Sequence, residues 1–503
     1  MDKRTSPPVP LLANAAASAL SRRRRHLPAP DTTELDSVSQ PRGRIAIIGG
    51  GPGGYEAALV AAQLGADVTV VERDGLGGAC VLTDCVPSKT LIATSGMMAA
   101  LDGAASLGIR LNTGGQPAAL LDAPRLYTRV QSLARAQSAD VASRLSAEGV
   151  KVISGTARLV GPRLVAAGDA QIEADAVLIA TGAQPRVLPG AEPDGERILT
   201  WRQLYDLTEL PAELIVVGSG VTGAEFASAY QALGSQVTLV SSRDRVLPHE
   251  DADAAVVVED VFRRRGMMVL GKSRAERVAR TGDGVTVTLS DGRTVRGTHC
   301  LLTVGMVPNT SGLGLAEAGV DVDDRGFIHV DKVSRTSAPG VYAAGDCTGV
   351  LMLATVAAMQ GRTAMWHALG EAVKPLRLSN VAATIFTEPE IASVGIPEKA
   401  VDSGAIPDAI LVKLPLATNA RAKMQGFRDG FVKLIARRSS GTVLGGVVVA
   451  PRASELILAV SLAVERQLSV DHVAHTFAVY PSLSGSLTEA ARKLMQPAED
   501  GPP

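Results

Sequence analysis

The hydrophobic positions along the chain form short apolar runs separated by glycines and by longer amphipathic stretches. The first clear unit has an apolar run at 44–48, a glycine-rich stretch, an Ala/Leu-rich segment at 55–64 and a second apolar run at 67–71. Runs of this length are typical of buried strands, and the segment between them is long enough for a helix. The pattern therefore predicts a β-α-β unit of a parallel sheet.

The same unit recurs later in the chain. An apolar run at 214–217 leads into glycines, a helical segment at 224–233 and a second run at 236–240. An internal repeat of this kind predicts two nucleotide-binding domains rather than one large domain.

The remaining patterns predict a long helix, two hairpin regions and a separate C-terminal part. The helix covers about 123–148, and strands with glycine turns are expected over 151–182 and 285–296. From about residue 375 the pattern changes to strand-rich segments and two helices. We therefore expect an α/β protein with two Rossmann-like dinucleotide-binding domains and an α+β C-terminal domain.

The composition is that of a globular protein with an aliphatic core. Of the 503 residues, 46% are hydrophobic and only 3% aromatic, and the formal net charge is −1. This balance gives no reason to expect nucleic acid or an anionic membrane as a partner. Because no apolar run reaches the roughly 18 residues of a membrane span, we expect a cytoplasmic protein without an integral membrane segment.

The first 42 residues differ from the rest. They contain proline-rich pieces, a small-residue stretch at 11–20 and then the run Arg22–Arg25. A signal peptide has its basic residues before the apolar part, whereas here they follow it. We expect a disordered tail or a start placed too far upstream, with a targeting or docking role as the alternative.

Each repeated unit carries a glycine fingerprint. In the first loop, Gly49 allows a tight turn, Gly51 lets the backbone approach a pyrophosphate, and Gly54 lets the helix pack on the strand. Glu72 ends the second strand about 20 positions later, where an acid binds ribose hydroxyls. Strand, helix and acid together indicate a dinucleotide site rather than an ordinary glycine turn.

The second loop has glycines at the equivalent places, Gly218, Gly220 and Gly223. Its second strand ends in Ser241, Ser242 and Arg243, without an acid. A carboxylate there would repel a ribose 2′-phosphate, whereas serine and arginine remove the repulsion and offer a cation. We expect NADPH to be accepted alongside NADH; the alternative is that Arg243 only faces solvent.

Two cysteines, Cys80 and Cys85, follow the first loop with four residues between them. At the start of a helix this spacing can place two sulfurs within disulfide reach, and a helix N-terminus lowers the pKa of a thiol. No further cysteine pair or nearby histidine offers zinc ligands, so a metal is not expected. Cys300 and Cys347 stand alone and are expected to be small buried residues.

These motifs resemble the flavoprotein disulfide reductases, which include lipoamide dehydrogenase, glutathione reductase, mercuric reductase and soluble transhydrogenase. The resemblance covers nearly all of residues 43–495. It is carried by Gly77-Gly78-Ala79-Cys80, Cys85-Val86-Pro87-Ser88-Lys89, Ile179-Ala180-Thr181-Gly182, Gly305-Met306-Val307-Pro308-Asn309-Thr310 and Tyr342-Ala343-Ala344-Gly345-Asp346. It implies FAD in the first loop, NAD(P)H as the electron donor in the second, and a homodimer through the C-terminal domain.

The resemblance also implies how the chain is divided and which residues hold the cofactors. The expected parts are an extension at 1–42, FAD-binding segments at 43–190 and 313–374, an NAD(P)-binding domain at 191–312, a dimerisation domain at 375–495 and a tail at 496–503. Lys89 would lie near the flavin and pair with Glu225, the alternative being an ordinary surface ion pair. Further cofactor contacts are implied for Glu72, Ala157, Thr181, Gly182, Asp346, Ala354 and Gly305.

The chain departs from this family near its C-terminus. Disulfide-reducing members carry His-x-His-Pro-x-x-x-Glu, whose second His protonates and deprotonates the substrate thiol. Tyr480 stands in place of that His and Gly485 in place of the Glu. A positioned general acid/base is worth about 10²–10⁴-fold, and a tyrosine with a pKa near 10 is a poor base at neutral pH. His472 and His475 are out of register and are expected to be surface or capping residues.

A quinone can take electrons from reduced flavin without this histidine or a dithiol. The runs at 198–207, 419–424 and 480–485 are similar to the NAD(P)H:quinone reductase branch related to lipoamide dehydrogenase. We therefore expect an FAD enzyme that passes electrons from NAD(P)H to a quinone or similar small oxidant, with Cys85 nearer the flavin, Cys80 outside it and Tyr480 in the acceptor pocket. The alternatives are a dihydrolipoyl dehydrogenase-like disulfide reductase with an altered base, a soluble pyridine nucleotide transhydrogenase, and a flavin-binding docking subunit without turnover.

Overall fold

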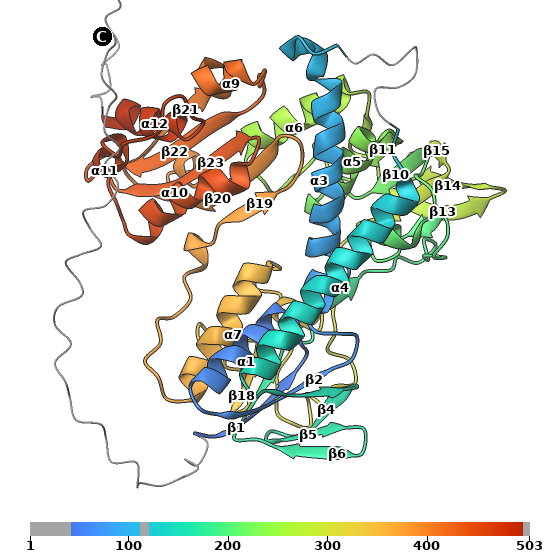
Figure 1. Cartoon of the computed structure of the whole chain (residues 1–503), viewed down its shortest axis with the longest axis vertical. Helices are drawn as coiled ribbons and strands as arrows, with labels where there is room; N and C mark the ends of the chain where they lie inside the picture. Colours follow the sequence, from blue (N-terminus) through green and yellow to red (C-terminus); the bar gives the residue numbers. More distant parts are fainter. Residues whose placement is uncertain (1–41, 111–119, 496–503) are drawn as a thin grey trace, which may run out of the picture. The chain divides into compact units, whose positions relative to one another are not determined.

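The computed structural model describes residues 42–110 and 120–495 (Figure 1). The expectations for the N-terminal extension and for the tail at 496–503 therefore lie outside the described residues, apart from Arg42. Within the described ranges, no helix is both long enough and apolar enough to cross a membrane.

The first sheet has the strand order β18-β7-β1-β2-β3. Its strands are β1 (Arg44–Ile48), β2 (Asp67–Glu72), β3 (Lys151–Ser154), β7 (Ala176–Ile179) and β18 (Val341–Ala343). As the hydrophobic pattern predicts, β1 and β2 are parallel and α1 (Pro52–Gln63) connects them. A later helix, α7 (Ala354–Ala368), packs beside α1, because Gly53 and Gly361 let the two backbones approach closely (Figure 1).

The hairpin region expected at 151–182 is only partly correct. Its outer strands, β3 and β7, pair in parallel with β2 and β1 in the first sheet. Only the middle strands form an antiparallel sheet, namely β4 (Ala157–Gly161), β5 (Leu164–Ala167) and β6 (Ala170–Glu173). Local alternation indicates a strand but does not reveal a parallel partner that is distant in the sequence.

The second sheet has the order β12-β11-β10-β16-β9. Its strands are β9 (Ile198–Leu199), β10 (Glu213–Val217), β11 (Gln236–Val240), β12 (Met268–Leu270) and β16 (His299–Leu302). The predicted repeat is confirmed, since α5 (Val221–Leu233) connects the parallel strands β10 and β11. The second hairpin is also confirmed, in an antiparallel sheet of β13 (Ala275–Thr281), β14 (Gly284–Leu289) and β15 (Thr294–Gly297).

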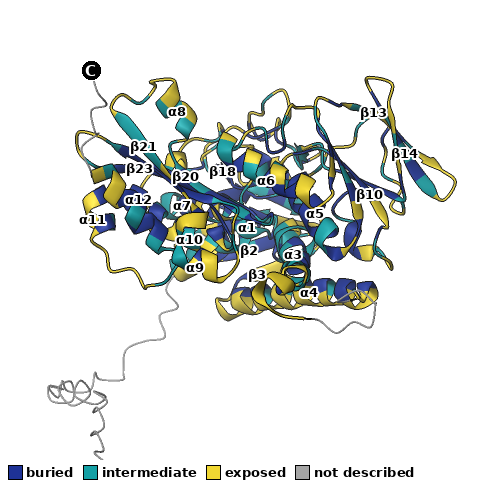
Figure 2. Cartoon of the chain, turned by 90° about the horizontal axis from the view of Figure 1, so that it is seen from above, coloured by how far each residue is buried: buried dark blue, intermediate teal, exposed yellow. Residues whose placement is uncertain are grey.

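Three α-helices lie between β2 and β3 along the chain, and the first two carry the cysteine pair. They are α2 (Gly78–Leu82), α3 (Cys85–Asp102) and α4 (Ala123–Ala147), the last close to its predicted bounds. Asp122 caps α4, with Oδ1 accepting from Arg125 N at 3.0 Å. The α4 helix is exposed along its outer face (Figure 2). Its buried face packs on α3, which also contacts α5 of the second unit.

The C-terminal sheet has the order β19-β20-β23-β22-β21. Its strands are β19 (Ala383–Ile385), β20 (Glu390–Gly395), β21 (Ala409–Pro415), β22 (Phe431–Arg437) and β23 (Val443–Ala450). The helices are α8 (Glu398–Asp402), α9 (Ala420–Met424), α10 (Ala453–Glu465), α11 (Val470–Ala474) and α12 (Gly485–Met495), rather than the two expected. The three additional helices have only five residues each, too few to show a helical period. The fold is thus the predicted one, with two dinucleotide-binding units and an α+β C-terminal domain.

Candidate redox site

The first glycine loop takes a shape that excludes a side chain at two of its positions. Gly49 has a φ of +105°, and a Cβ there would lie 2.3 Å from Ala180 O. A Cβ on Gly54 would lie 1.9 Å from Gly49 O. Gly51, at the N-cap of α1, has no described heavy atom within 4 Å of where its Cβ would be. This open position at a helix N-terminus fits the pyrophosphate of a dinucleotide.

The second glycine loop repeats this geometry. Gly218 has a φ of +113°, with Thr303 O at 2.3 Å from the ideal Cβ position, and Gly223 would clash with Gly218 O at 1.9 Å. Gly220, the N-cap of α5, again has no described atom within 4 Å. Two loops of the same construction therefore fit two dinucleotides.

Glu72 forms a hydrogen bond to the first glycine loop, whose dinucleotide it is predicted to bind. Its Oε2 accepts from Gly50 N at 2.5 Å, while Oε1 accepts from Asp74 N at 2.7 Å and Gly75 N at 3.2 Å. The carboxylate thus fixes the end of β2 against the glycine turn. Contact between Glu72 and a ribose remains a prediction.

The other residues predicted to bind FAD gather at the carboxyl edge of the first sheet. Gly49, Thr181 and Asp346 directly follow the parallel strands β1, β7 and β18 or come within three residues of their ends. Ligands of open parallel sheets bind at this edge. Thr181 Oγ1 is buried and has no hydrogen-bond partner among the described residues. An unpaired buried hydroxyl costs about 1–3 kcal/mol, so it fits a site that a cofactor completes.

Burial also affects Asp346, the first residue of a 3₁₀ turn (Asp346–Thr348). Burial, together with the charge of Asp84, raises the pKa of Asp346 to about 6. Ala157 begins β4 and is buried, Gly182 has a φ of +69°, and Ala354 begins α7. Their predicted contacts with FAD remain predictions.

The cysteine pair spans the junction between α2 and α3. Cys80 lies within α2, Cys85 is the first residue of α3, and both are partly buried free thiols. The interaction of each thiol with the other lowers the pKa of Cys80 and raises that of Cys85. The structure therefore brings the two sulfurs together, as the spacing predicts.

Lys89 lies one turn further along α3, and its ammonium group is 2.7 Å from Glu225 Oε2 on α5. The Glu225 side chain is only 5% exposed, and Oε1 accepts from Phe386 N at 2.9 Å. Burial alone would lower the pKa of Lys89, but the Glu225 carboxylate raises it above its ordinary value. The burial of Glu225 distinguishes this pair from an ordinary surface ion pair.

The serines after β11 have different surroundings. Ser241 is buried, and its Oγ is 2.7 Å from Ser219 Oγ in the second glycine loop and accepts from Arg243 N at 3.1 Å. Its hydroxyl therefore holds the turn together rather than facing outward. Ser242 and the Arg243 side chain are exposed at the carboxyl edge of the second sheet. Gly305, three residues after β16, lies exposed near the same edge with a φ of +107°.

The C-terminal segment carries Tyr480 and, upstream of it, the two histidines His472 and His475. Tyr480 is 85% exposed. His472 takes part in the capping box of α11 with Ser469, and His475 Nδ1 lies 3.2 Å from Asp471 Oδ1. The expectation that both histidines are capping or surface residues is confirmed.

The two single cysteines are fully buried, as expected. Burial raises the pKa of Cys347 to about 11 and also raises that of Cys300. Neither therefore resembles a reactive thiol.

One acidic residue of the site was missed in the sequence. Asp84 directly precedes Cys85, and its side chain makes no capping hydrogen bond to α3. Burial raises the pKa of Asp84, an effect that Lys89 and Arg202 oppose. Its charge in turn raises the pKa of both Cys80 and Cys85. The only sequence signal was its place between the two cysteines.

Two matched dinucleotide loops on parallel sheets, with a dithiol and a lysine paired to a buried glutamate between them, define a dinucleotide-dependent oxidoreductase. The family model described as pyridine nucleotide-disulphide oxidoreductase matches residues 43–361, and the dimerisation domain of that family matches 381–491. The chain belongs to the pyridine nucleotide-disulphide oxidoreductase family. It is accordingly an FAD-dependent oxidoreductase that uses NAD(P)H, and its dimerisation domain supports a homodimer.

Similar proteins include members with two different names. A Mycobacterium tuberculosis protein named NAD(P)H dehydrogenase (quinone) is 57% identical over 466 residues, which cover 90% of this chain and 94% of that protein. A Chlorobaculum tepidum dihydrolipoyl dehydrogenase is 34% identical over 461 residues, covering 90% and 97%. The crystal structure of LpdA from Mycobacterium tuberculosis matches with a TM-score of 0.85 and 56% identity, covering 90% of this chain and all of that one.

Proposed function

We propose that this protein passes electrons from NAD(P)H to a quinone or a similar small oxidant. The observation that carries the proposal is Tyr480, which stands where disulfide-reducing relatives have their acid/base histidine. Of the two nearby histidines, His472 is engaged in the N-terminal capping box of α11 and His475, its C-cap residue, contacts Asp471, so neither offers a replacement base. The relative with 57% identity is named for quinone reduction, which supports the same acceptor.

The residues of the chain position the reactants. Bound FAD would be held by the first glycine loop and by Thr181, and it supplies the two-electron chemistry between nucleotide and acceptor. NADPH would occupy the second loop, with its 2′-phosphate near Ser242 and Arg243. The overall reaction converts NADPH, a proton and a quinone into NADP⁺ and a hydroquinone. We place the enzyme in the cytoplasm, where its donor is available.

The test is turnover of NADPH with a soluble naphthoquinone by the FAD-loaded protein. We expect a rate well above that of the uncatalysed reaction, and no turnover with lipoamide. The double change Tyr480→His and Gly485→Glu, which restores the family pattern, should raise lipoamide turnover from this baseline. Quinone reduction no faster than the spontaneous reaction would rule the proposal out.

A second candidate is a disulfide reductase that works through Cys80 and Cys85, and the effect of each thiol on the pKa of the other favours it. Anaerobic titration with NADPH separates the two functions. A long-wavelength thiolate–flavin absorbance after two electrons would show that the pair accepts electrons. If Cys85→Ala abolishes this absorbance but leaves quinone turnover intact, the dithiol is not on the path to the quinone.

A further inference from the structure

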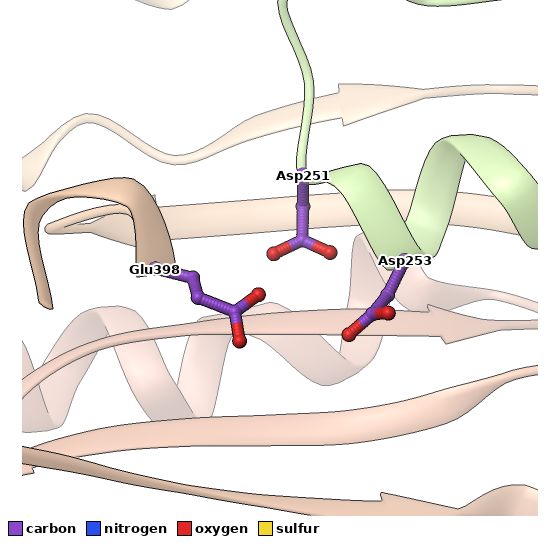
Figure 3. Close-up of side chains that lie close together, drawn as sticks. All are labelled: Asp251, Asp253 and Glu398. Carbon is purple, nitrogen blue, oxygen red and sulfur yellow. The ribbon is translucent and has the colours of Figure 1, made fainter. Parts of the chain in front are cut away.

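Three carboxylates from two distant parts of the chain surround one buried ammonium group. Asp251 caps helix α6 (Ala252–Arg264), Asp253 lies in its first turn, and Glu398 begins α8. Their carboxylates point toward one another (Figure 3). Lys433 Nζ, on β22, is 2.8 Å from Asp251 Oδ2 and 2.9 Å from Asp253 Oδ2, and it also bonds Glu398 Oε2. The place that a metal ion would take among these acids is filled by lysine.

Lys433 supplies the buried positive charge that pairs with all three carboxylates. The Lys433 side chain is 0% exposed. A second lysine, Lys413, is partly exposed, and of the three carboxylates its Nζ contacts that of Asp253, with Oδ2 at 2.9 Å. Burial alone would lower the pKa of Lys433, but the three carboxylates hold it above its ordinary value, so the group is charged at neutral pH. Removing one partner of a buried ion pair leaves the others desolvated and unpaired, which is strongly destabilising locally.

Asp251 connects this cluster to the second nucleotide-binding unit. Its Oδ1 accepts from Ala254 N at 3.1 Å and so caps α6, while Oδ2 bonds Lys433. A single carboxylate therefore joins the first turn of α6 to β22, an inner strand of the C-terminal sheet.

The segment at 241–250, which we call the recognition loop, runs from the end of β11 to Asp251. It is held by hydrogen bonds at its first residue and again at 246–247. Ser241 Oγ contacts Ser219 Oγ, and Leu247 N donates to Ser219 O at 2.8 Å in the second glycine loop. Val246 N donates to Glu259 Oε2 of α6 at 3.0 Å. The loop that carries Arg243 is thus hydrogen-bonded both to the second glycine loop and to α6, which begins directly after it.

We propose that Lys433 is a positioning residue for NADPH: from the C-terminal sheet it anchors α6 and thereby holds the recognition loop where Ser242 and Arg243 meet the 2′-phosphate. The inference rests on the proposed role of this loop in nucleotide binding. NADPH differs from NADH only in its 2′-phosphate. Loss of the anchor should therefore weaken the binding of NADPH more than the binding of NADH.

The experiment compares Lys433→Met with Lys413→Met in the FAD-loaded protein. Lys413 contacts the same Asp253 but does not reach Asp251, so it is the matched control. We expect Lys433→Met to raise the Kd for NADP⁺ about 10-fold, equivalent to about 1.4 kcal/mol, with a change of less than about 3-fold for NAD⁺. Amide hydrogen exchange at 241–254 should become faster, while FAD content stays the same. Lys413→Met should change neither nucleotide affinity nor exchange.

A folding defect is controlled by the combined change Lys433→Met, Asp253→Asn and Glu398→Gln, which removes two of the carboxylates that the lysine neutralises. This variant should regain thermal stability and still bind NADP⁺ weakly. Equal losses for NADP⁺ and NAD⁺, or unchanged exchange at 241–254 in Lys433→Met, would overturn the anchor. If the Arg243→Ala variant binds NADP⁺ as tightly as the wild type, the recognition loop does not bind the 2′-phosphate. The hydrogen-exchange data would then still decide whether Lys433 anchors α6.

Discussion

Lys89 Nζ lies 2.7 Å from Glu225 Oε2, and this contact joins the helix that carries Cys85 to the helix that follows the second glycine loop. The other oxygen of Glu225 accepts from Phe386 N at 2.9 Å, just after β19. Three segments that are remote in the sequence therefore meet at one buried carboxylate, between the two nucleotide loops.

Replacing Glu225 by Gln should destabilise the protein, because it leaves the Lys89 charge without its counter-charge in a mostly buried site. We expect the free energy of unfolding to fall by about 3 kcal/mol, the lower end for a broken buried pair, since a third of the Lys89 side chain is exposed. Urea unfolding of the FAD-loaded protein measures this. Glu489→Gln, in an exposed pair with Arg492, is the control and should change stability by less than about 1 kcal/mol. Equal effects in the two variants would contradict the prediction.

The two glycine loops predict separable losses of cofactor. Gly51 and Gly220 have negative φ and open space around them, so Gly51→Ala and Gly220→Ala should both fold. The added methyl occupies the place of a pyrophosphate. Gly51→Ala should therefore lower the flavin-to-protein absorbance ratio, while Gly220→Ala should keep its flavin but resist bleaching by NADPH. Gly49→Ala, which places a Cβ against Ala180 O, should fail to fold. A Gly220→Ala protein that NADPH bleaches normally would show that the second loop is not the donor site.

These loops could be predicted from the sequence because every part of the fingerprint is local. The first strand, the glycines, α1 and Glu72 lie within one short segment, and the structure reproduces their predicted bounds closely. The strands β3 and β7 were expected in hairpins because their parallel partners are far away in the sequence. Five-residue helices such as α8 and α11 lack a periodic signal.

The parts of the site that the sequence did not reveal depend on tertiary contacts. Ser241 was expected to face the nucleotide, but packing turns its hydroxyl toward Ser219. The ion cluster around Lys433 combines residues from α6, α8 and β22, and no local pattern indicates that they meet. Burial likewise decides that Glu225 is not on the surface.

Asp84 should control the acidity of the cysteine pair. Its negative charge disfavours both thiolates, so Asp84→Asn should lower the thiol pKa values and shift the pH midpoint of alkylation downward. The rate of iodoacetamide modification of the reduced protein, followed from pH 6 to 10, measures this. Asp74→Asn, at the exposed pair with Arg73, is the matched control. An unchanged midpoint in Asp84→Asn would show that the charge of the Asp84 carboxyl does not affect the pKa values of the two thiols.

Arg243 should determine the preference between the two nucleotides. It is exposed at the carboxyl edge of the second sheet, and a charge-assisted hydrogen bond is worth about 1.5–3 kcal/mol. Arg243→Ala should therefore raise the KM for NADPH by about 10-fold or more and leave the KM for NADH nearly unchanged. Arg296→Ala, on the exposed part of β15, serves as the control for general loss of positive charge. Equal increases for NADPH and NADH would refute the assignment.

His299 predicts a pH dependence of stability that is independent of the redox site. It is buried on β16, where Arg197 Nη1 donates to its Nε2 at 3.1 Å, so the ring is held in its neutral form. Burial and the Arg197 charge lower its pKa to about 4.

In the unfolded chain this histidine has a pKa near 6.5. Between pH 6.5 and 4 the unfolded state therefore binds a proton that the folded state does not, and stability falls as the pH falls, by up to about 1.4 kcal/mol per pH unit. His299→Gln keeps an acceptor for Arg197 but cannot titrate, so the slope of unfolding free energy between pH 6.5 and 5 should be shallower than in the wild type. Urea unfolding at pH 7.0, 6.0 and 5.0 measures the slope, with His329→Gln, at an exposed histidine, as the control. If His299→Gln and the wild type lose stability in parallel, protonation of His299 does not contribute to acid unfolding.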